Sequence, residues 1–409
     1  MDTGVSHPRS KAVRAALRIY LCALPLTGFY ILGEWLRLYV VAALLLLLVV
    51  AGALVFRTEL PVASYQLMPE DLLLALLLGA MGLAALINLS PKSLNYLAGY
   101  GFVFLCLYML VKLAVALSQE GLTSIYALLG AVAVAAAVLG VLQFSLKLTT
   151  GVDLLSYIPL PKMAIVEATY AGLPRAASTV IEPGYFAMFL QAIGPIGVYG
   201  LWRKTRNRVV TTGATGIVLA GWVLAFSAGG AVASAGAAAG VLVVSLIRRH
   251  RPIALRLSIG LAILFVAGAV LATIYGDYVM VLVRKIQTGG GARPTGWLEG
   301  LHTVADHPLV GTGPGSTTTG RSVSYWSWYL TLTAEVGIAG LLAPLFLAVK
   351  GCRAAMLKRP EWPLLLFGLL ATAAHLSVVS TFMYGFIWLT VALIDVAAAR
   401  RRVPAGGLA

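Results

Sequence analysis

Residues 293–342 read RPTGWLEGLHTVADHPLVGTGPGSTTTGRSVSYWSWYLTLTAEVGIAGLL and carry most of the reactive side chains of a chain that is otherwise largely apolar. The first half of this segment is polar, glycine-rich, basic and aromatic, and the second half is apolar. An apolar half of this kind is typical of a helix that enters a bilayer, so the polar half must lie at a membrane surface. We expect residues 293–342 to form half of an active site at the outer face, with residues 147–183 supplying the other half.

The rest of the chain has the composition of a membrane protein. Of its 409 residues, 60% are hydrophobic and 11% are charged, whereas a soluble domain carries about 25% charged residues. The sequence predicts an all-α, polytopic membrane protein that forms one bundle over residues 1–409. We expect about twelve spans of the length that crosses the hydrocarbon layer, at 15–33, 36–56, 71–90, 94–118, 122–146, 183–202, 208–227, 230–247, 254–275, 326–349, 362–381 and 384–398.

Five basic clusters lie beside these expected spans and predict the orientation. They are Arg9, Lys11, Arg14 and Arg18; Arg203, Lys204, Arg206 and Arg208; Arg248, Arg249, Arg251 and Arg256; Lys350, Arg353, Lys358 and Arg359; and Arg400, Arg401 and Arg402. With about twelve spans, all of these clusters fall on one side, which is the positive-inside pattern. We therefore expect both termini in the cytoplasm and two long outer loops, at 147–182 and 276–325.

The composition excludes several other classes of protein. The net charge of +15 is explained by the basic clusters, and no basic face with interleaved aromatic residues indicates nucleic-acid binding. Cys22, Cys106 and Cys352 are far apart, so neither a disulfide framework nor a metal site is expected. The basic N-terminal segment lacks a small-residue cleavage site, which indicates a retained first helix. Small residues at 229–240 indicate close helix packing.

The expected outer loops also contain basic residues, which the positive-inside rule does not require. They are Lys147, Lys162, Arg175, Arg284, Lys285, Arg293 and Arg321. Binding of an anion would explain them. Solvation, or pairing with Asp153, Glu167 or Glu299, is the alternative explanation.

The second outer loop is expected to contain a short surface helix at 293–307. Trp297, Leu301 and Val304 form one apolar stripe on it, facing lipid or protein, and His302 lies on another face. The glycines at 311, 313 and 315 either let backbone N–H groups approach an oxyanion or form a turn between helices. Tyr325 and Trp326 belong to an aromatic group at the mouth of the next span, which suits an interfacial belt or stacking on sugar rings.

Three acidic or histidine side chains complete the set of candidates. Glu182 precedes Pro183 at the start of an expected helix, where the helix dipole stabilises a carboxylate; it is either a helix-terminal charge or a general base. Glu335 and His375 lie inside apolar spans. Polar groups at that depth are functional candidates, although a hydrogen bond between helices is the commoner role.

In these features the chain resembles the O-antigen polymerase and ligase superfamily of bacterial envelope glycosyltransferases, over residues 170–345. The resemblance is carried by the order of the spans and by four motifs: Arg175 ahead of EPGYFA at 182–187, Arg293 with Trp297, HPLVGTGPG at 307–315, and YLTLTAEVGIAGLL at 329–342.

The resemblance implies a glycosyltransferase at the outer face of the bacterial inner membrane. Its donor and acceptor would be oligosaccharides linked to undecaprenyl diphosphate, with no cofactor and no metal, and a flippase and a chain-length regulator would be further partners. By motif position, Arg175 and Arg293 would hold the donor diphosphate, with Arg321 as a third cation. Trp297, Tyr325 and Trp326 would contact glycan or lipid.

One position departs from the ligases of this superfamily. Trp326 stands where those ligases place a candidate catalytic histidine, which favours a polymerase that inverts the anomeric carbon. Glu182 is then the first candidate for the general base and His302 the second. A ligase acting on lipid A–core or another acceptor is the main alternative, and a flippase for lipid-linked oligosaccharides is a third.

Overall fold

A computed structural model describes residues 8–31, 36–55, 67–118, 120–158, 169–170, 173–180, 182–250, 252, 255, 293–318, 325–380 and 383–399. This part of the chain is helical apart from turns and one pair of two-residue antiparallel strands, β1 (Thr169–Tyr170) and β2 (Leu173–Pro174). The prediction of an all-α fold is confirmed for these residues.

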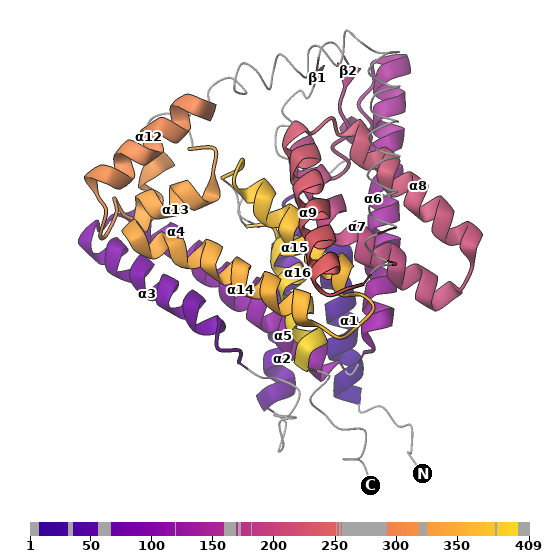
Figure 1. The fold of residues 1–409 in the computed structure, drawn as a ribbon, viewed down its shortest axis with the longest axis horizontal. Helices are drawn as coiled ribbons and strands as arrows, with labels where there is room; N and C mark the ends of the chain where they lie inside the picture. The colour runs from indigo at the N-terminus through magenta and orange to yellow at the C-terminus, as the bar shows by residue number, and fades with distance from the viewer. Residues whose placement is uncertain are drawn as a thin grey trace.

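The helices follow one another in the order seen in Figure 1. They are α1 (Pro8–Ala23), α2 (Leu38–Val55), α3 (Asp71–Ile87), α4 (Pro91–Phe102), the π-helix η2 (Val103–Met109), α5 (Leu110–Leu117), α6 (Leu122–Thr150), the 3-10 helix η3 (Leu154–Tyr157), α7 (Pro183–Thr205), α8 (Arg208–Leu224), α9 (Ala228–Ile247), α12 (Arg293–Asp306), the 3-10 helix η4 (Ser316–Thr318), α13 (Trp328–Val336), the 3-10 helix η5 (Gly337–Leu341), α14 (Leu342–Met356), α15 (Trp362–Leu376) and α16 (Gly385–Ala399).

Among the described residues, six helical segments are long and apolar enough to cross a membrane. They are Leu38–Val55, Pro91–Leu117, Leu122–Thr150, Pro183–Thr205, Ala228–Ile247 and Trp328–Met356, and α3, α8, α15 and α16 are shorter apolar helices. Leu48 of α2 and Leu86 of α3 lie on the outer sides of these helices and are 70% and 71% exposed. Apolar surface of this extent is expected where a helix faces lipid, so the protein is embedded in a membrane.

Several span boundaries differ from the expected ones. The first helix stops at Ala23 rather than at residue 33, because Pro25 disfavours helical geometry in the residue before it. α6 continues to Thr150 and ends at Gly151, whose φ is 71°, so the first outer loop begins later than residue 147. Apart from Leu255, the span expected at 254–275 lies outside the described residues.

The last helix, α16, lies in the middle of the bundle, where it contacts α5, α7, α14 and α15 (Figure 1). Its residues from Gly385 to Ala397 are all buried. α6 and α7 form the most extensive helix pair, with α8 packed against both of them. α15 packs against both α7 and α9, so these three helices lie side by side. The candidate site lies at one end of them.

Glycine allows the close approach of α6 and α7. A Cβ atom added to Gly197 would lie 2.6 Å from the Cα atom of Gly130 on the facing helix. On α9, Gly229, Gly230 and Gly240 also have close neighbours, whereas Gly236 has none within 4 Å. The close packing expected at 229–240 is therefore confirmed at three of these glycines and not at the fourth.

We expect Gly197→Val to lower the free energy of unfolding by about 1–3 kcal/mol, because the new side chain must push two backbones apart. Thermal unfolding of the purified protein in detergent measures this loss. Gly213→Val on α8 is the matched control, because a Cβ atom there meets nothing within 4 Å. Equal melting temperatures for the two variants would contradict the packing argument.

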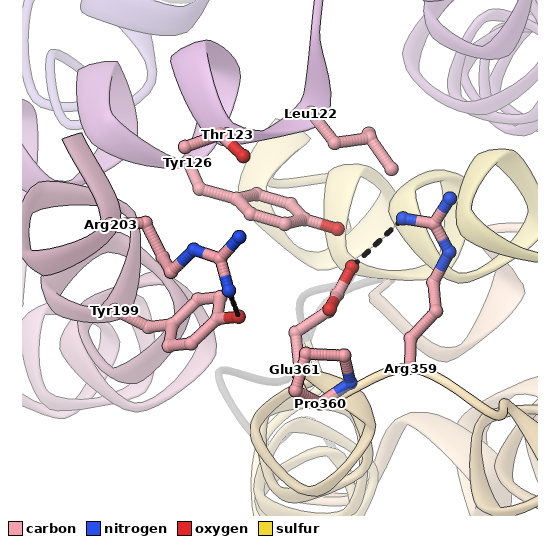
Figure 2. Close-up of a pocket in the computed structure, with 8 residues that line it drawn as sticks. All are labelled: Leu122, Thr123, Tyr126, Tyr199, Arg203, Arg359, Pro360 and Glu361. Atoms are coloured by element: carbon pink, nitrogen blue, oxygen red, sulfur yellow. Dashed lines mark hydrogen bonds and ion pairs between the residues drawn. The ribbon is translucent and has the colours of Figure 1, made fainter.

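Basic residues from three helix ends gather at one end of the bundle. Arg203 at the end of α7 and Arg359 after α14 line the same pocket (Figure 2). Arg248 after α9 and Lys358 line an adjoining pocket that shares Arg359. At the same end Arg14 and Arg18 of α1 bind Ser118 and Glu120, just before α6 begins. The grouping of these clusters agrees with the sidedness expected from the sequence.

The basic cluster of Lys350, Arg353, Lys358 and Arg359 does not lie wholly at the end of the bundle. α14 extends to Met356, so Lys350 and Arg353 lie inside the helix rather than in the loop after it. Lys350 is fully buried, and Arg353 pairs with Glu70. Only Lys358 and Arg359 of that cluster belong to the basic end of the bundle.

Candidate active site

Arg175 is held at the junction of α8 and α9. It follows β2 and is half-buried, and its Nε donates a hydrogen bond to the Ala225 carbonyl at 3.0 Å. The adjacent backbone amide of Ala176 donates to the Leu224 carbonyl at 2.9 Å. Two contacts therefore fix the Arg175 segment against the end of α8, directly before α9.

Arg293 is the first residue of α12 and reaches toward the end of α15. Its guanidinium carbon lies 5.6 Å from the ring centre of Trp326, a cation–π contact. Two residues after Trp326, the amide of Trp328 donates to the carbonyl of Val379, just after α15, at 2.8 Å. Arg293 thus links the start of α12 to the segment before α13, which lies beside the end of α15.

The first turn of α9 connects the surroundings of the two arginines. A Cβ atom on Gly229, in the first turn of α9, would lie 3.7 Å from Nε2 of His375. The Ala225 carbonyl, which accepts the hydrogen bond from Arg175, lies three residues before the start of α9. Arg175 and Arg293 are 118 positions apart in the sequence, yet Arg175 is held just before α9, and Arg293 lies against Trp326, close to the end of α15 that packs on Gly229. The positive end of the α9 dipole adds to their charges, so this region favours an anion.

The candidate site and the basic end lie at opposite ends of the same helices. α7, α9 and α15 each have one end beside the site and the other beside the pocket that contains Arg203, Arg248 and Arg359. The three helices have 23, 20 and 15 residues, which corresponds to about 34, 30 and 22 Å. These lengths are comparable to the hydrocarbon thickness of about 30 Å.

His375 belongs to a buried polar chain between α15, α7 and α9. Its Nδ1 lies 3.5 Å from Oε1 of Gln191, whose Nε2 donates to Oγ of Ser234 at 2.8 Å and to the Gly230 carbonyl. The imidazole is therefore engaged in a helix–helix contact. The sequence identified His375 by its depth in an apolar run, but nothing in the sequence indicated Gln191 as its neighbour.

Glu182 is the N-cap residue of α7 and its side chain is exposed and does not cap the helix. Three residues further on, the ring of Tyr185 lies 4.6 Å from that of Tyr384, the residue before α16. Glu182 therefore lies at the same end of α7 as the arginine site.

His302 is placed differently. It is exposed on α12, nine residues after Arg293, which is about 13 Å along a helix. α12 contacts α13 where Gly300 packs against Leu330, and His302, two residues further along the helix, is exposed on another side. The structure thus separates the second candidate base from Arg293.

The expected surface helix is confirmed at Arg293–Asp306. Trp297 and Leu301 of the expected apolar stripe are 37% and 57% exposed, so this stripe does not form the contact with the bundle. Tyr325 packs beside Gly300 and its hydroxyl lies 2.8 Å from Oγ1 of Thr303. Arg321 lies outside the described residues.

The glycine-rich segment forms a structural turn. The amides of Thr312 and Gly313 donate to the carbonyls of Ala334 and Glu335 at 3.0 and 2.9 Å. The hydroxyl of Thr317 donates to the buried Glu335 carboxylate at 2.8 Å. Gly311, Gly313 and Gly315 have φ angles of 72°, 92° and 76°, which glycine adopts most readily. These bonds favour the turn between helices over an oxyanion site, and they explain Glu335 as the anchor of that turn.

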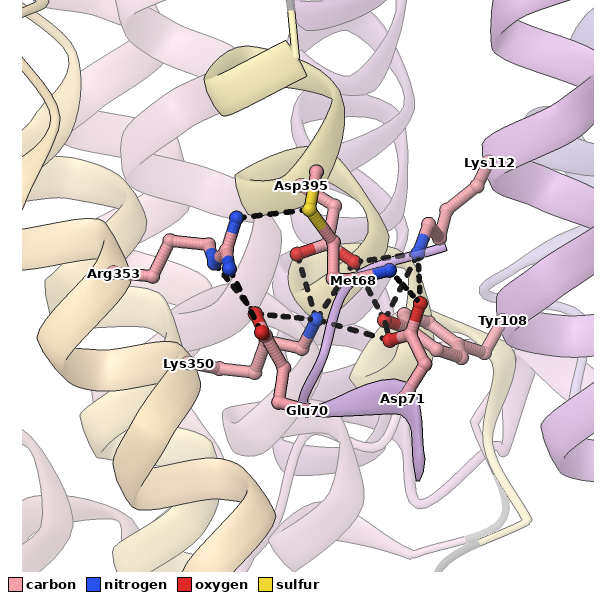
Figure 3. Close-up of polar contacts among 8 residues, drawn as sticks. All are labelled: Met68, Glu70, Asp71, Tyr108, Lys112, Lys350, Arg353 and Asp395. Atoms are coloured by element: carbon pink, nitrogen blue, oxygen red, sulfur yellow. Dashed lines mark hydrogen bonds and ion pairs between the residues drawn. The ribbon is translucent and has the colours of Figure 1, made fainter. Parts of the chain in front are cut away.

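The sequence analysis did not identify a buried ion network near the basic end (Figure 3). Lys112 of α5 lies 2.7 Å from Asp71 and 2.8 Å from Asp395, and Lys350 lies 2.7 Å from Asp395 and 3.2 Å from Asp71. The hydroxyl of Tyr108 binds both aspartates. Lys112 and Asp395 are isolated charges within apolar runs, and that signal could have revealed them.

The fold defines a helical membrane protein, and it holds Arg175 and Arg293 at the end of the bundle opposite the basic clusters. No family model matches the chain, and no curated protein matches it either. The resemblance to the O-antigen polymerase and ligase superfamily stays a prediction.

Proposed function

We propose that this protein is a bacterial polysaccharide polymerase of the inner membrane, with about twelve spans, cytoplasmic termini and two outer loops. It transfers a glycan from undecaprenyl diphosphate to the nonreducing end of another lipid-linked repeat unit, and it works with a flippase and a chain-length regulator. The observation that carries the proposal is that Arg175, held just before α9, and Arg293, at the start of α12, lie at the end of the bundle opposite the basic clusters.

The two arginines suit a diphosphate leaving group. The acceptor hydroxyl attacks the anomeric carbon, a new C–O bond forms, and the bond from that carbon to the diphosphate oxygen breaks with inversion. The diphosphate gains charge as it leaves, and guanidinium groups offer it paired hydrogen-bond donors. Donors that are fixed before the reaction stabilise this charge at little reorganisation cost.

The general base must accept the proton of the acceptor hydroxyl. Glu182 is the better candidate than His302, because it is exposed and lies at the same end of α7 as the arginine site. Trp326 beneath the Arg293 guanidinium offers an aromatic surface to a sugar ring. Trp297 and Tyr325 are secondary candidates for contact with glycan or lipid, and Arg321 for contact with the diphosphate.

Purified protein supplied with one lipid-linked repeat unit tests the proposal. We expect a ladder of glycans that remain attached to undecaprenyl diphosphate, with undecaprenyl diphosphate released at each transfer. Transfer only to lipid A–core or another added acceptor would show a ligase instead. Movement of the lipid across a vesicle membrane with no new glycosidic bond would show a flippase.

A further inference from the structure

The basic end of the bundle contains two adjoining cavities that the proposed reaction does not use. The larger has a volume of about 1100 Å³ and lies between α7, α9 and α15. Its walls are mostly apolar and include Pro195, Trp202, Val241, Trp362, Leu364 and Phe367. The smaller, of about 440 Å³, shares Tyr199, Arg359 and Pro360 with it and extends to the start of α6.

Cationic side chains line the two cavities and outnumber the acidic ones. Arg203, Arg248, Lys358 and Arg359 face a single carboxylate among the lining residues, that of Glu361. Arg203 and Arg359 enter the smaller cavity from opposite sides, with Glu361 between them (Figure 2). Glu361 pairs with Arg359 at 3.1 Å, and the cationic side chains that line the cavities still outnumber the acidic ones that do.

One of these cations is held rigidly. The guanidinium of Arg248 lies 4.6 Å from the ring centre of Trp362 and donates to the Leu357 carbonyl at 3.2 Å and to the Ala355 carbonyl. The ring of His250 lies 6.2 Å from the same indole. The charge is therefore positioned at the mouth of an apolar cavity before any ligand binds.

We propose that this double cavity binds one anionic phospholipid of the surrounding leaflet. The phosphate headgroup would lie among Arg203, Arg248 and Lys358, and an acyl chain would cover Trp202, Trp362 and Phe367. A free phosphate would match only the cations and would leave the apolar walls uncovered. A zwitterionic lipid would match the walls but would lack the net negative charge, so charge complementarity selects an anionic lipid. The inference does not depend on the proposed polymerase activity.

Lipid titration of the full-length protein in detergent tests the proposal, with tryptophan fluorescence and the melting temperature as measurements. We expect phosphatidylglycerol to bind saturably and to raise the melting temperature. Phosphatidylcholine with the same acyl chains, and inorganic phosphate or glycerol phosphate alone, should do neither. The Arg203→Gln, Lys358→Gln double variant should bind phosphatidylglycerol about 30-fold more weakly, as the loss of two surface cations near an anionic headgroup predicts.

The matched control is the Lys204→Gln, Arg208→Gln double variant. It removes the same charge from exposed positions at the same end, and neither side chain lines a cavity. We expect its affinity for phosphatidylglycerol to fall less than about 3-fold. The proposal is overturned if phosphatidylcholine binds as well as phosphatidylglycerol, if the two double variants lose affinity equally, or if glycerol phosphate alone gives the full effect.

Discussion

Arg293→Ala and Arg175→Ala should each abolish the formation of long glycan chains while the protein remains folded in the membrane. Removing one fixed donor to a developing negative charge lowers a rate by about 10²–10³-fold. Arg293 also contacts Trp326, and Arg175 also binds the Ala225 carbonyl. Because the loss of these contacts could lower stability, protein abundance and the melting temperature must be measured beside the product ladder. Arg293→Lys should also fail, because an ammonium group lacks the planar fork of donors.

Arg208→Ala is the control for this experiment. It removes an exposed arginine from the opposite end of the bundle, so the ladder should keep its normal length. A normal ladder from either Arg175→Ala or Arg293→Ala would remove the assignment of that arginine to the diphosphate. If both variants melt as the unaltered protein does and still polymerise, the cationic site at the start of α9 is not the active site.

The second large effect is expected at the buried ion network. Asp395→Leu should lower the free energy of unfolding by about 3–5 kcal/mol, because it leaves Lys112 and Lys350 with Asp71 as their one remaining shared carboxylate inside an apolar bundle. Asp395 lies on the central helix α16 and is 1% exposed. Equilibrium unfolding of the purified protein in detergent, at increasing denaturant concentration, measures this loss of free energy.

A charge-balanced variant separates this electrostatic effect from simple loss of packing. Lys350→Met combined with Asp395→Leu leaves Lys112 paired with Asp71 and Arg353 paired with Glu70. The double variant should therefore be more stable than Asp395→Leu alone, since replacement of a complete buried pair by apolar residues is often neutral. The loss in the double variant is compared with the sum of the losses in Asp395→Leu and Lys350→Met measured separately. If it equals that sum, Asp395 and Lys350 do not depend on each other and the network has no cooperative role.

The two ends of the bundle differ in the way that they carry positive charge. Near the basic end, Lys112 and Lys350 are neutralised by carboxylates from α3 and α16, and this network joins four helices that are distant in the sequence. At the opposite end, Arg175 donates a hydrogen bond to the Ala225 carbonyl and Arg293 lies against the ring of Trp326.

Local pattern was sufficient to predict much of the fold. Apolar runs predicted a helix at each expected span within the described residues, and the spacing of Trp297, Leu301 and Val304 together with Pro308 predicted α12 almost to the residue. Helix ends were less certain, since Pro25 stops the first helix early and α6 continues past residue 146. The motifs also indicated Arg175 and Arg293 as a pair, although no single motif specified how they would meet.

The sequence by itself determined an all-helical membrane protein whose basic residues gather at one end, because hydropathy and charge act within each segment and along its neighbours. Only the tertiary structure decided that Arg175 is held just before α9 and Arg293 against Trp326, that His302 lies apart from Arg293, and that Lys350 is buried against Asp395. These outcomes depend on which helices pack together after long loops close, and the pairing of distant segments depends on the shape and charge of both partners rather than on either one alone.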